Sequence, residues 1–194
     1  MFEKRMTHPF KKIPADYIAG EELQIGMFVT IDHAKKEVKK ATSADKVQGI
    51  VIRGSKISWR NALGIPESIY DEYQNKLPKG IKVGVFPFEP AERFTTDVVD
   101  TAIKTALEAK GTTLAQKKTA LVGKELTVVN GVLKEATSGN TVIAVIHDVT
   151  NEGFNDRAMK DSALLNSEGG NITELYGLVE HFVISYTIVR PYTK

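Results

Sequence analysis

The stretch from Val38 to Val51, VKKATSADKVQGIV, is the most informative part of the sequence, because the chain repeats its pattern. The second version, VLKEATSGNTVIAVI, runs from Val132 to Ile146, and the two Ala-Thr-Ser triplets lie 95 positions apart. The same offset aligns apolar positions after the triplet, so the agreement exceeds three letters that would recur by chance. Upstream, GMFVTID at 26–32 aligns with GKELTVV at 123–129, with a turn two residues longer in the first copy.

Each copy reads as a glycine, a strand, a polar turn, a short strand, Ala-Thr-Ser and a third apolar strand. Such self-similarity indicates a duplicated supersecondary unit. Equal burial patterns impose equal strand registers, so we expect residues 26–52 and 123–147 to superpose. The predicted fold class is mainly β with one substantial helix (α+β), built from two related small β-barrel-like units that share a core.

The predicted organisation has four parts. Residues 1–20 form an extended N-terminal arm, and residues 21–94 form the first β-unit with a short helix after Pro66. Residues 95–120 form a connecting helix, and residues 121–194 form the second β-unit.

The connecting helix is predicted from TTDVVDTAIKTALEAKG, residues 95–111. Apolar residues recur there at helical spacing, from Val98 to Leu107. Thr95 or Thr96 is expected to cap its start, because a hydroxyl can accept from the free N–H groups of the first turn.

The strongest strand signal is HFVISYTIVR, residues 181–190. Its composition would invite aggregation at an exposed sheet edge, so we expect a central strand or one paired with a neighbouring subunit. Ile184, Tyr186 and Ile188 should be buried together with Phe182, and the Tyr186 hydroxyl should reach a partner or water.

Composition limits the class of protein. The 194 residues are 42% hydrophobic and 26% charged, as in ordinary globular chains. The net charge of +2 is too balanced for a surface that binds nucleic acid all over. The absence of cysteine excludes disulfides and thiolate metal sites. No apolar run approaches the roughly 20 residues of a membrane helix, and the basic N-terminus lacks the apolar region of a secretory signal.

The N-terminal segment has little capacity to fold alone. Pro9 and Pro14 break any helix, and the apolar residues are scattered. It is either a frayed terminus or an arm that docks on another chain through aromatic and basic anchors. The candidate partner contacts are Phe2, Lys4, Arg5, Phe10, Lys11 and Lys12. We expect deletion of residues 1–18 to leave the fold intact and to weaken attachment to the partner.

No catalytic, cofactor-binding or metal-binding constellation is found. The histidines, at positions 8, 33, 147 and 181, lack the mutual spacing of metal ligands. His147 and Asp148 are adjacent on a strand, so their side chains point to opposite faces and do not form a dyad. The lysine-rich turns at 35–40 and 117–118 read as solvated surface, because no stacking aromatics are interleaved with them. We therefore expect no cofactor and no enzymatic activity.

The phrase GMFVTIDHAKKEVKKATSADKVQGIVI, residues 26–52, resembles the small β-barrel modules of tailed-bacteriophage virion proteins, especially head decoration proteins. VIAVIHDVT, residues 142–150, is similar to the apolar strand ending in His-Asp-Val that often closes this module in decoration proteins of phages infecting Gram-positive hosts. ELYGLVEHFVI, residues 174–184, is similar to the strand that follows it. The helical insert at 95–111, the duplication and the greater length depart from that family.

The resemblance implies a capsid decoration or cement protein on the outer surface of the head shell. It implies the major capsid protein or other virion subunits as partners, a homo-oligomer, and a location in the virion after synthesis in the host cytoplasm. Membrane and nucleic acid are not expected as partners.

Other classes stay open. Head-fibre, neck and tail structural or adaptor proteins reuse similar barrels. A host carbohydrate-binding module would use aromatics such as Trp59, Tyr70 and Tyr73. A nucleic-acid-binding barrel would use the lysine turns, and its binding to polyanions would fall steeply with salt. An enzyme is the least favoured class, because a site needs convergent polar groups.

Overall fold

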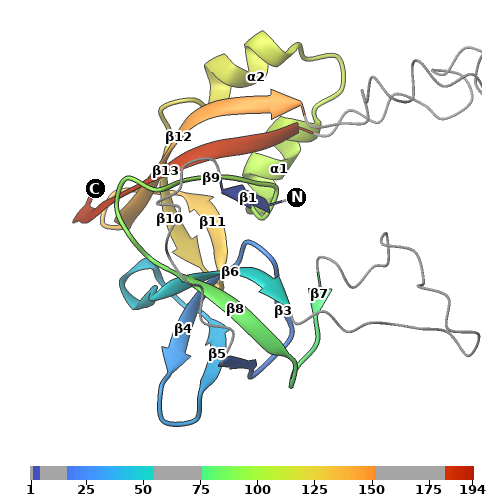
Figure 1. Ribbon diagram of the computed structural model, residues 1–194. Helices are drawn as coiled ribbons and strands as arrows, with labels where there is room; N and C mark the ends of the chain where they lie inside the picture. The colour runs from blue at the N-terminus through green and yellow to red at the C-terminus, as the bar shows by residue number, and fades with distance from the viewer. Residues whose placement is uncertain (1, 5–16, 55–75, 152–181) are drawn as a thin grey trace, which may run out of the picture.

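The computed structural model describes residues 2–4, 17–54, 76–151 and 182–194. These residues form a closed five-stranded barrel below a six-stranded sheet, against which two helices pack (Figure 1). The molecule is therefore mainly β with a smaller helical part, as the sequence predicts. Among these residues, no helix has the length and apolar character that crossing a membrane requires.

The barrel is closed by a short strand from the N-terminal region. Its strand order is β2-β5-β4-β6-β8, and β2 pairs parallel with β5 and antiparallel with β8. A separate pair, β3 (Leu23–Gln24) and β7 (Lys76–Leu77), lies beside it, and a 3-10 turn, η1 (Ala44–Lys46), precedes β6. The barrel strands are β2 (Tyr17–Ala19), β4 (Phe28–Asp32), β5 (Glu37–Lys40), β6 (Gly49–Gly54) and β8 (Lys82–Pro87).

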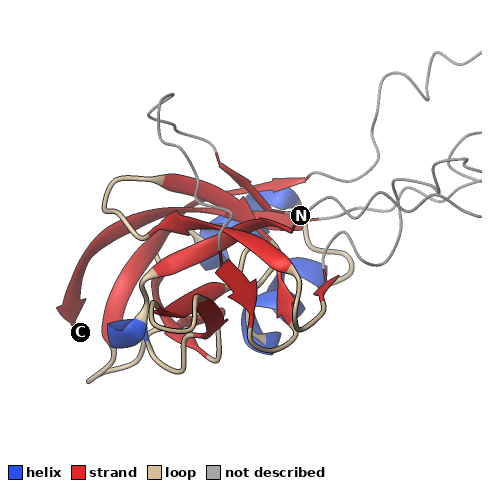
Figure 2. Cartoon of the chain, turned by 60° about the horizontal axis from the view of Figure 1, so that its bottom comes forward, coloured by secondary structure: helices blue, strands red, loops and turns tan. Residues whose placement is uncertain are grey.

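The sheet has the order β1-β9-β13-β12-β10-β11, with all neighbours antiparallel. Strands β12 and β13 are the longest described strands, and Figure 1 shows them side by side above the barrel. Figure 2 shows that strands make up most of the described molecule and that the helices occupy a smaller part of it. The sheet strands are β1 (Phe2–Lys4), β9 (Arg93–Thr96), β10 (Glu125–Val129), β11 (Val132–Glu135), β12 (Thr141–Asn151) and β13 (Phe182–Thr193).

Strand order and register confirm the duplication. Strand β4 pairs antiparallel with β5 and β6, and β10 pairs in the same way with β11 and β12. The pair Thr30↔Lys39 corresponds to Thr127↔Lys134, with offsets of 97 before the turn and 95 after it. The same offsets convert Val29↔Gly49 into Leu126↔Ala144. The first copy lies in the closed barrel, whereas the second lies in a sheet whose described strands do not close.

The glycine that begins each copy also has the same role twice. Gly26 and Gly123 both adopt the left-handed conformation, with φ of 96° and 85°. The Gly26 N–H donates to the Val51 carbonyl at 2.7 Å, and the Gly123 N–H donates to the Ile146 carbonyl at 2.8 Å. Positive φ is accessible to glycine at little cost, which explains its place at the head of both units.

One hydrophobic core joins the two units. Barrel residues such as Phe28 and Phe86 pack in the same buried cluster as Phe94, Ile143 and Tyr186 of the sheet. The Tyr186 ring stacks on Phe94 with centroids 5.8 Å apart, and Phe28 lies 6.2 Å away on the barrel side. A smaller cluster that includes Val29, Val38 and Val83 fills the barrel itself. The predicted shared core is therefore present.

The single helix predicted for residues 95–120 is wrong. Residues 93–96 form strand β9, and the helical part is divided into α1 (Thr101–Glu108) and α2 (Leu114–Leu121). Val99 makes a parallel bridge with Leu133, so pairing with β11 buries it in extended backbone. Asp100, rather than Thr95 or Thr96, caps α1, because its carboxylate accepts from the Ile103 N–H at 3.0 Å. The short helix predicted after Pro66 lies outside the described residues up to position 75, and its described end forms strand β7 (Lys76–Leu77) instead.

The boundary of the predicted N-terminal arm also changes. Strand β2 belongs to the barrel, and Ala19 is buried in the barrel core. Strand β1 pairs with β9 at the edge of the sheet, from Phe2↔Thr96 to Lys4↔Phe94. Residues 2–4 and 17–19 are therefore held by backbone pairing, although the side chains of the N-terminal segment did not predict strands there. Residues 5–16, between them, lie outside the described part of the chain.

The central position predicted for residues 181–190 is confirmed from Phe182 onward. Strand β13 lies between β9 and β12, and Ile184, Tyr186 and Ile188 are buried in one cluster, whereas Phe182 is only partly buried against it. Its buried Ser185 hydroxyl is satisfied by the Thr95 hydroxyl of β9 at 3.1 Å. The hydroxyl of Tyr186 is buried and makes no hydrogen bond with another described residue. Burial raises its pKa well above the usual value for tyrosine.

Candidate interaction surface

Among the described residues, no group of three or more His, Asp or Glu side chains is placed to hold a metal ion. His33 and His147 lie in different units, and the remaining histidines, at positions 8 and 181, fall outside the described ranges.

His147 and Asp148 face different partners, as the strand geometry predicts. The His147 ring lies 3.3 Å from the Thr187 hydroxyl on β13, whereas Asp148 forms an ion pair with Lys118 at 2.7 Å. A shift in register between Ile146 and Asp148 marks a β-bulge at this position. Burial, followed by the charge of Arg93, lowers the pKa of His147, and the hydrogen bond from Lys118 lowers the pKa of Asp148. The two side chains stabilise strand and helix contacts and make no catalytic dyad.

One of the lysines assigned to solvated surface is buried. Lys117 lies on α2 with 3% of its surface exposed, and its ammonium donates to the carbonyls of Leu107 and Ala109 at 2.6 and 2.8 Å. These carbonyls end helix α1, where a cation is favoured by the helix dipole. The ammonium also lies 4.6 Å from the centre of the Phe182 ring. Lys117 therefore joins the two helices to β13, and the sequence expectation for it is wrong.

The basic turn of the first unit is exposed, as expected. Lys35, Lys36 and Lys39 are exposed on the β4–β5 hairpin. The nearby rings of Tyr17 and His33 contact each other edge to face, with centroids 6.1 Å apart. The turn is a solvated hairpin tip beside the strand that closes the barrel.

Only two of the six predicted partner contacts lie among the described residues. Phe2 and Lys4 lie on β1, at the outer edge of the six-stranded sheet. Arg5, Phe10, Lys11 and Lys12 fall outside the described residues. Among the described residues, β1 pairs with β9 alone, so its other side carries the backbone groups of an edge strand.

A contact between the two units gives the most detailed interaction geometry. Strands β4 and β5 begin to separate at Phe28 and Ala41, which keep one backbone hydrogen bond, and this position is called here the first fork. The tip of the β10–β11 hairpin enters it: the Phe28 N–H donates to the Gly131 carbonyl at 2.9 Å, and the Gly131 N–H donates to the Ala41 carbonyl at 2.8 Å. The N–H and the carbonyl of one residue, Gly131, thus bridge the two strands. Figure 1 shows this hairpin pointing from the sheet toward the barrel.

The hairpin tip needs glycine at its second position. Asn130 and Gly131 have φ of 51° and 79°, the pair of positive values that a type I′ turn requires. A Cβ on Gly131 would also lie 3.1 Å from the Phe28 carbonyl oxygen and 3.3 Å from the Lys40 side chain. An Asn-Gly pair in a sequence indicates a tight hairpin turn, but the docking of this turn depends on how the two units pack.

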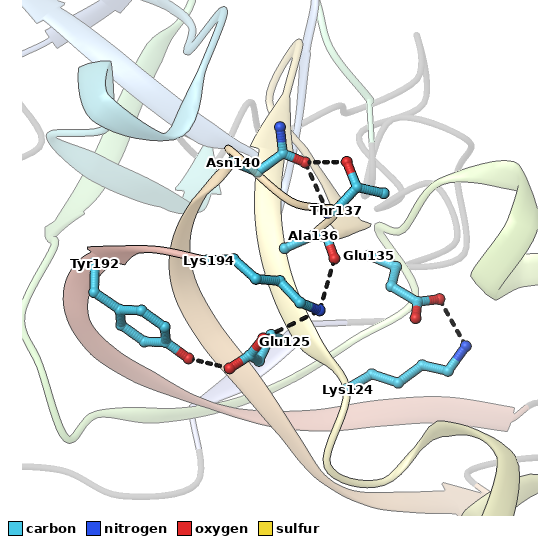
Figure 3. Close-up of polar contacts among 8 residues, drawn as sticks. All are labelled: Lys124, Glu125, Glu135, Ala136, Thr137, Asn140, Tyr192 and Lys194. Atoms are coloured by element: carbon cyan, nitrogen blue, oxygen red, sulfur yellow. Dashed lines mark hydrogen bonds and ion pairs between the residues drawn. The ribbon is translucent and has the colours of Figure 1, made fainter.

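The equivalent position of the second unit, between Glu125 and Ala136, is called the second fork. Here Lys194 takes the place of a hairpin tip: its ammonium donates to the Ala136 carbonyl at 2.9 Å and lies 3.1 Å from the Glu125 carboxylate (Figure 3). The Tyr192 hydroxyl donates to the other oxygen of Glu125. These contacts, the Tyr192 hydrogen bond foremost, lower the pKa of Glu125 and raise that of Tyr192.

The loop beside the second fork is held as well. The Gly139 N–H donates to the Lys194 carbonyl at 3.1 Å, and the Lys194 N–H donates to the Asn140 carbonyl at 3.0 Å. The Asn140 side chain in turn accepts from the N–H and the hydroxyl of Thr137, both at 2.9 Å (Figure 3). Residues 192–194 therefore form a latch over the fork, made of one ammonium, one phenol and two backbone groups.

A cavity of about 260 Å³ lies between α1 and strand β3. Its lining combines apolar residues with Asp97, Lys104 and Glu108, and the last two form an exposed ion pair at 3.7 Å. The volume is below the roughly 300–1,000 Å³ of typical ligand pockets, and no set of polar groups converges on one point. The described residues therefore give no basis for a small-molecule site there.

Comparison with protein-family models, with curated proteins and with solved structures gave no match.

Proposed function

We propose that this chain is a structural protein of a tailed-bacteriophage virion, and specifically a decoration protein that binds the outer surface of the head shell. The position of β1 is the observation that carries this proposal. It is a short N-terminal strand at the edge of the six-stranded sheet, and 12 residues, 5–16, separate it from β2. An edge strand offers unpaired N–H and C=O groups to an added strand from another chain.

The rest of the molecule is consistent with a structural protein that acts only by binding other subunits. The two units share one core, so the scaffold presents its edges from a rigid body. Strand β12 contains residues 142–150, which resemble the closing strand of phage decoration modules, and it pairs with β13 over nine register positions. Decoration of a symmetric shell needs repeated contacts of one surface, and a catalytic cluster adds nothing to it.

The experiment is mass spectrometry of purified particles of the phage that encodes the chain, with copy number measured against the major capsid protein. Hundreds of copies per particle are expected for a decoration protein. A dozen or fewer would instead favour a neck, tail or head-fibre component, and absence from the particle would contradict a virion role.

A second measurement addresses the arm. Protein that lacks residues 1–16 should bind undecorated head shells more weakly than the full chain, while Lys110→Met, an exposed change outside the β1 edge, should bind normally. Equal binding of the truncated and full chains would show that β1 is not the contact.

A further inference from the structure

The two forks are equivalent in backbone geometry but differ in what occupies them. In both units the Ala of the Ala-Thr-Ser triplet donates its N–H to the residue that begins the first strand: Ala41 to the Phe28 carbonyl at 2.9 Å, and Ala136 to the Glu125 carbonyl at 2.8 Å. The carbonyl of the same alanine then accepts from an outside donor, which is Gly131 in one fork and Lys194 in the other. The second fork thus presents the acceptor that binds a glycine turn in the first.

We infer that the second fork is a docking site for a tight β-turn of a partner protein, with glycine in the left-handed conformation at its tip, and that the latch of residues 192–194 closes this site in the free chain. The turn chemistry follows from the first fork, where an Asn-Gly tip supplies an N–H to Ala41 and a carbonyl to Phe28. Only glycine combines the positive φ with so close an approach to the fork backbone.

The latch is built to open at small cost. Tyr192 is 42% exposed, and the side chains of Lys194 and Glu125 are 38% and 30% exposed, so water screens their ion pair. The pairing of β12 with β13 is irregular between Val142 and Ala144, where Pro191 falls on the β13 side, and only Thr141↔Thr193 and Val142↔Tyr192 pair beyond it. Short, exposed pairing of this kind belongs to the least stable part of a fold.

The chain's own hairpin cannot fill the second fork, because its tip is already docked in the first. The hairpin tip of the first unit is also unsuited. Lys36 stands where Gly131 stands in the second unit, and its carbonyl already accepts from the Ile18 N–H at 2.8 Å. A turn from another protein is therefore the occupant that the geometry fits, whether or not that protein belongs to a virion.

The probe for this site is a peptide of residues 125–136, cyclised head to tail through a D-Pro-Gly turn so that the Asn130–Gly131 tip is preformed. Its binding is measured by titration against the full chain and against Lys194→Met, which keeps the aliphatic stem and removes the ammonium. Lys110→Met is the matched control, because it makes the same change of charge at an exposed position after α1. Loss of the surface latch should tighten binding about five- to tenfold relative to both the full chain and the control.

Amide chemical shifts identify where the peptide binds. The expected result is perturbation at Glu125, Ala136 and Gly139, with Phe28 and Ala41 unchanged, and no binding by the same peptide carrying Gly131→Val. Equal affinity for the full chain and Lys194→Met would overturn the latch. Absence of binding to Lys194→Met, or perturbation confined to other residues, would overturn the docking site itself.

Discussion

Tyr186 is the residue whose environment departs most from ordinary chemistry. Its ring packs between Phe94 and Phe28, but its hydroxyl is buried without a hydrogen bond among the described residues. A buried donor left unsatisfied costs about 1–3 kcal/mol. Tyr186→Phe removes that cost and keeps the ring, so the free energy of unfolding in urea should rise by about 1 kcal/mol.

Tyr192→Phe is the matched control, because the Tyr192 hydroxyl is exposed and does have a partner, the Glu125 carboxylate. It should leave stability unchanged or slightly lower. A clear loss of stability in Tyr186→Phe would show that the hydroxyl is bonded in solution.

Alanine substitutions at Gly131 and Gly139 distinguish the cost of backbone strain from the cost of losing the docked hairpin tip. Both have positive φ, 79° and 85°, so replacement by alanine strains the backbone at each position. A Cβ on Gly139 meets nothing within 4 Å, whereas one on Gly131 would press on the Phe28 carbonyl in the first fork. Gly131→Ala should therefore lower the free energy of unfolding by about 1–3 kcal/mol more than Gly139→Ala does.

Chemical denaturation of the two variants checks this difference, and amide hydrogen exchange at Phe28 gives an independent measure of the docked tip. Equal losses in the two variants would mean that the tip leaves the fork without cost.

At the scale of elements, β13 holds the sheet together because it lies between β9 and β12 and contributes Ile184, Tyr186 and Ile188 to the core. Ile184 is fully buried, so Ile184→Ala should cost about 2–5 kcal/mol and the milder Ile184→Val about 0.5–1.5 kcal/mol. Ile184→Asp should not fold, because it buries an unpaired charge. Urea unfolding measures the first two, and a soluble, cooperatively unfolding Ile184→Asp protein would contradict this placement.

The strand elements were predictable from sequence because the repeat carries their register. Two residues more in one turn and an otherwise constant offset are enough to align every backbone pair of β4–β5 with one of β10–β11. The start of α1 was not predictable in the same way. Val98 and Val99 have helical spacing with Ile103 and Leu107, but a long-range bridge to Leu133 buries Val99 in extended backbone. The spacing of apolar residues correctly indicates that Val99 is buried. Its extended backbone conformation is set by the pairing with Leu133, which local sequence does not show.

The candidate surfaces were less predictable than the fold. The Asn-Gly tip and the Lys194 latch are seen to occupy equivalent positions only when the two units are compared in the structure. The position of Lys194 in the sequence does not indicate a contact with Ala136. Lys117 illustrates the same limit: next to Lys118 it reads as surface charge, yet the end of helix α1 supplies two buried carbonyls for its ammonium. Side-chain partners that come from distant elements leave little trace in local sequence.

At the scale of the whole molecule, the N-terminal region divides into a part that the fold needs and a part that it does not. Strand β1 adds three register pairs to a sheet that is complete without it, whereas β2 closes the barrel between β5 and β8. A chain lacking residues 1–16 should therefore unfold cooperatively, with near-native near-ultraviolet circular dichroism. A chain lacking residues 1–19 should lose the barrel, because removal of β2 exposes Val38 and Val83 and leaves the facing edges of β5 and β8 unpaired.

Hydrogen exchange locates the damage in the second truncation. Amide protection should fall first in β5 and β8 and persist in β12 and β13, since the larger core cluster draws most of its residues from the sheet. The boundary thus lies between residues 16 and 17, and a deletion of residues 1–18 would already remove Tyr17 and Ile18, which pair with Val83 and Lys82. If the chain lacking residues 1–19 kept full protection in β5 and β8, the barrel would close without β2, and the whole N-terminal region would be free to serve as an arm.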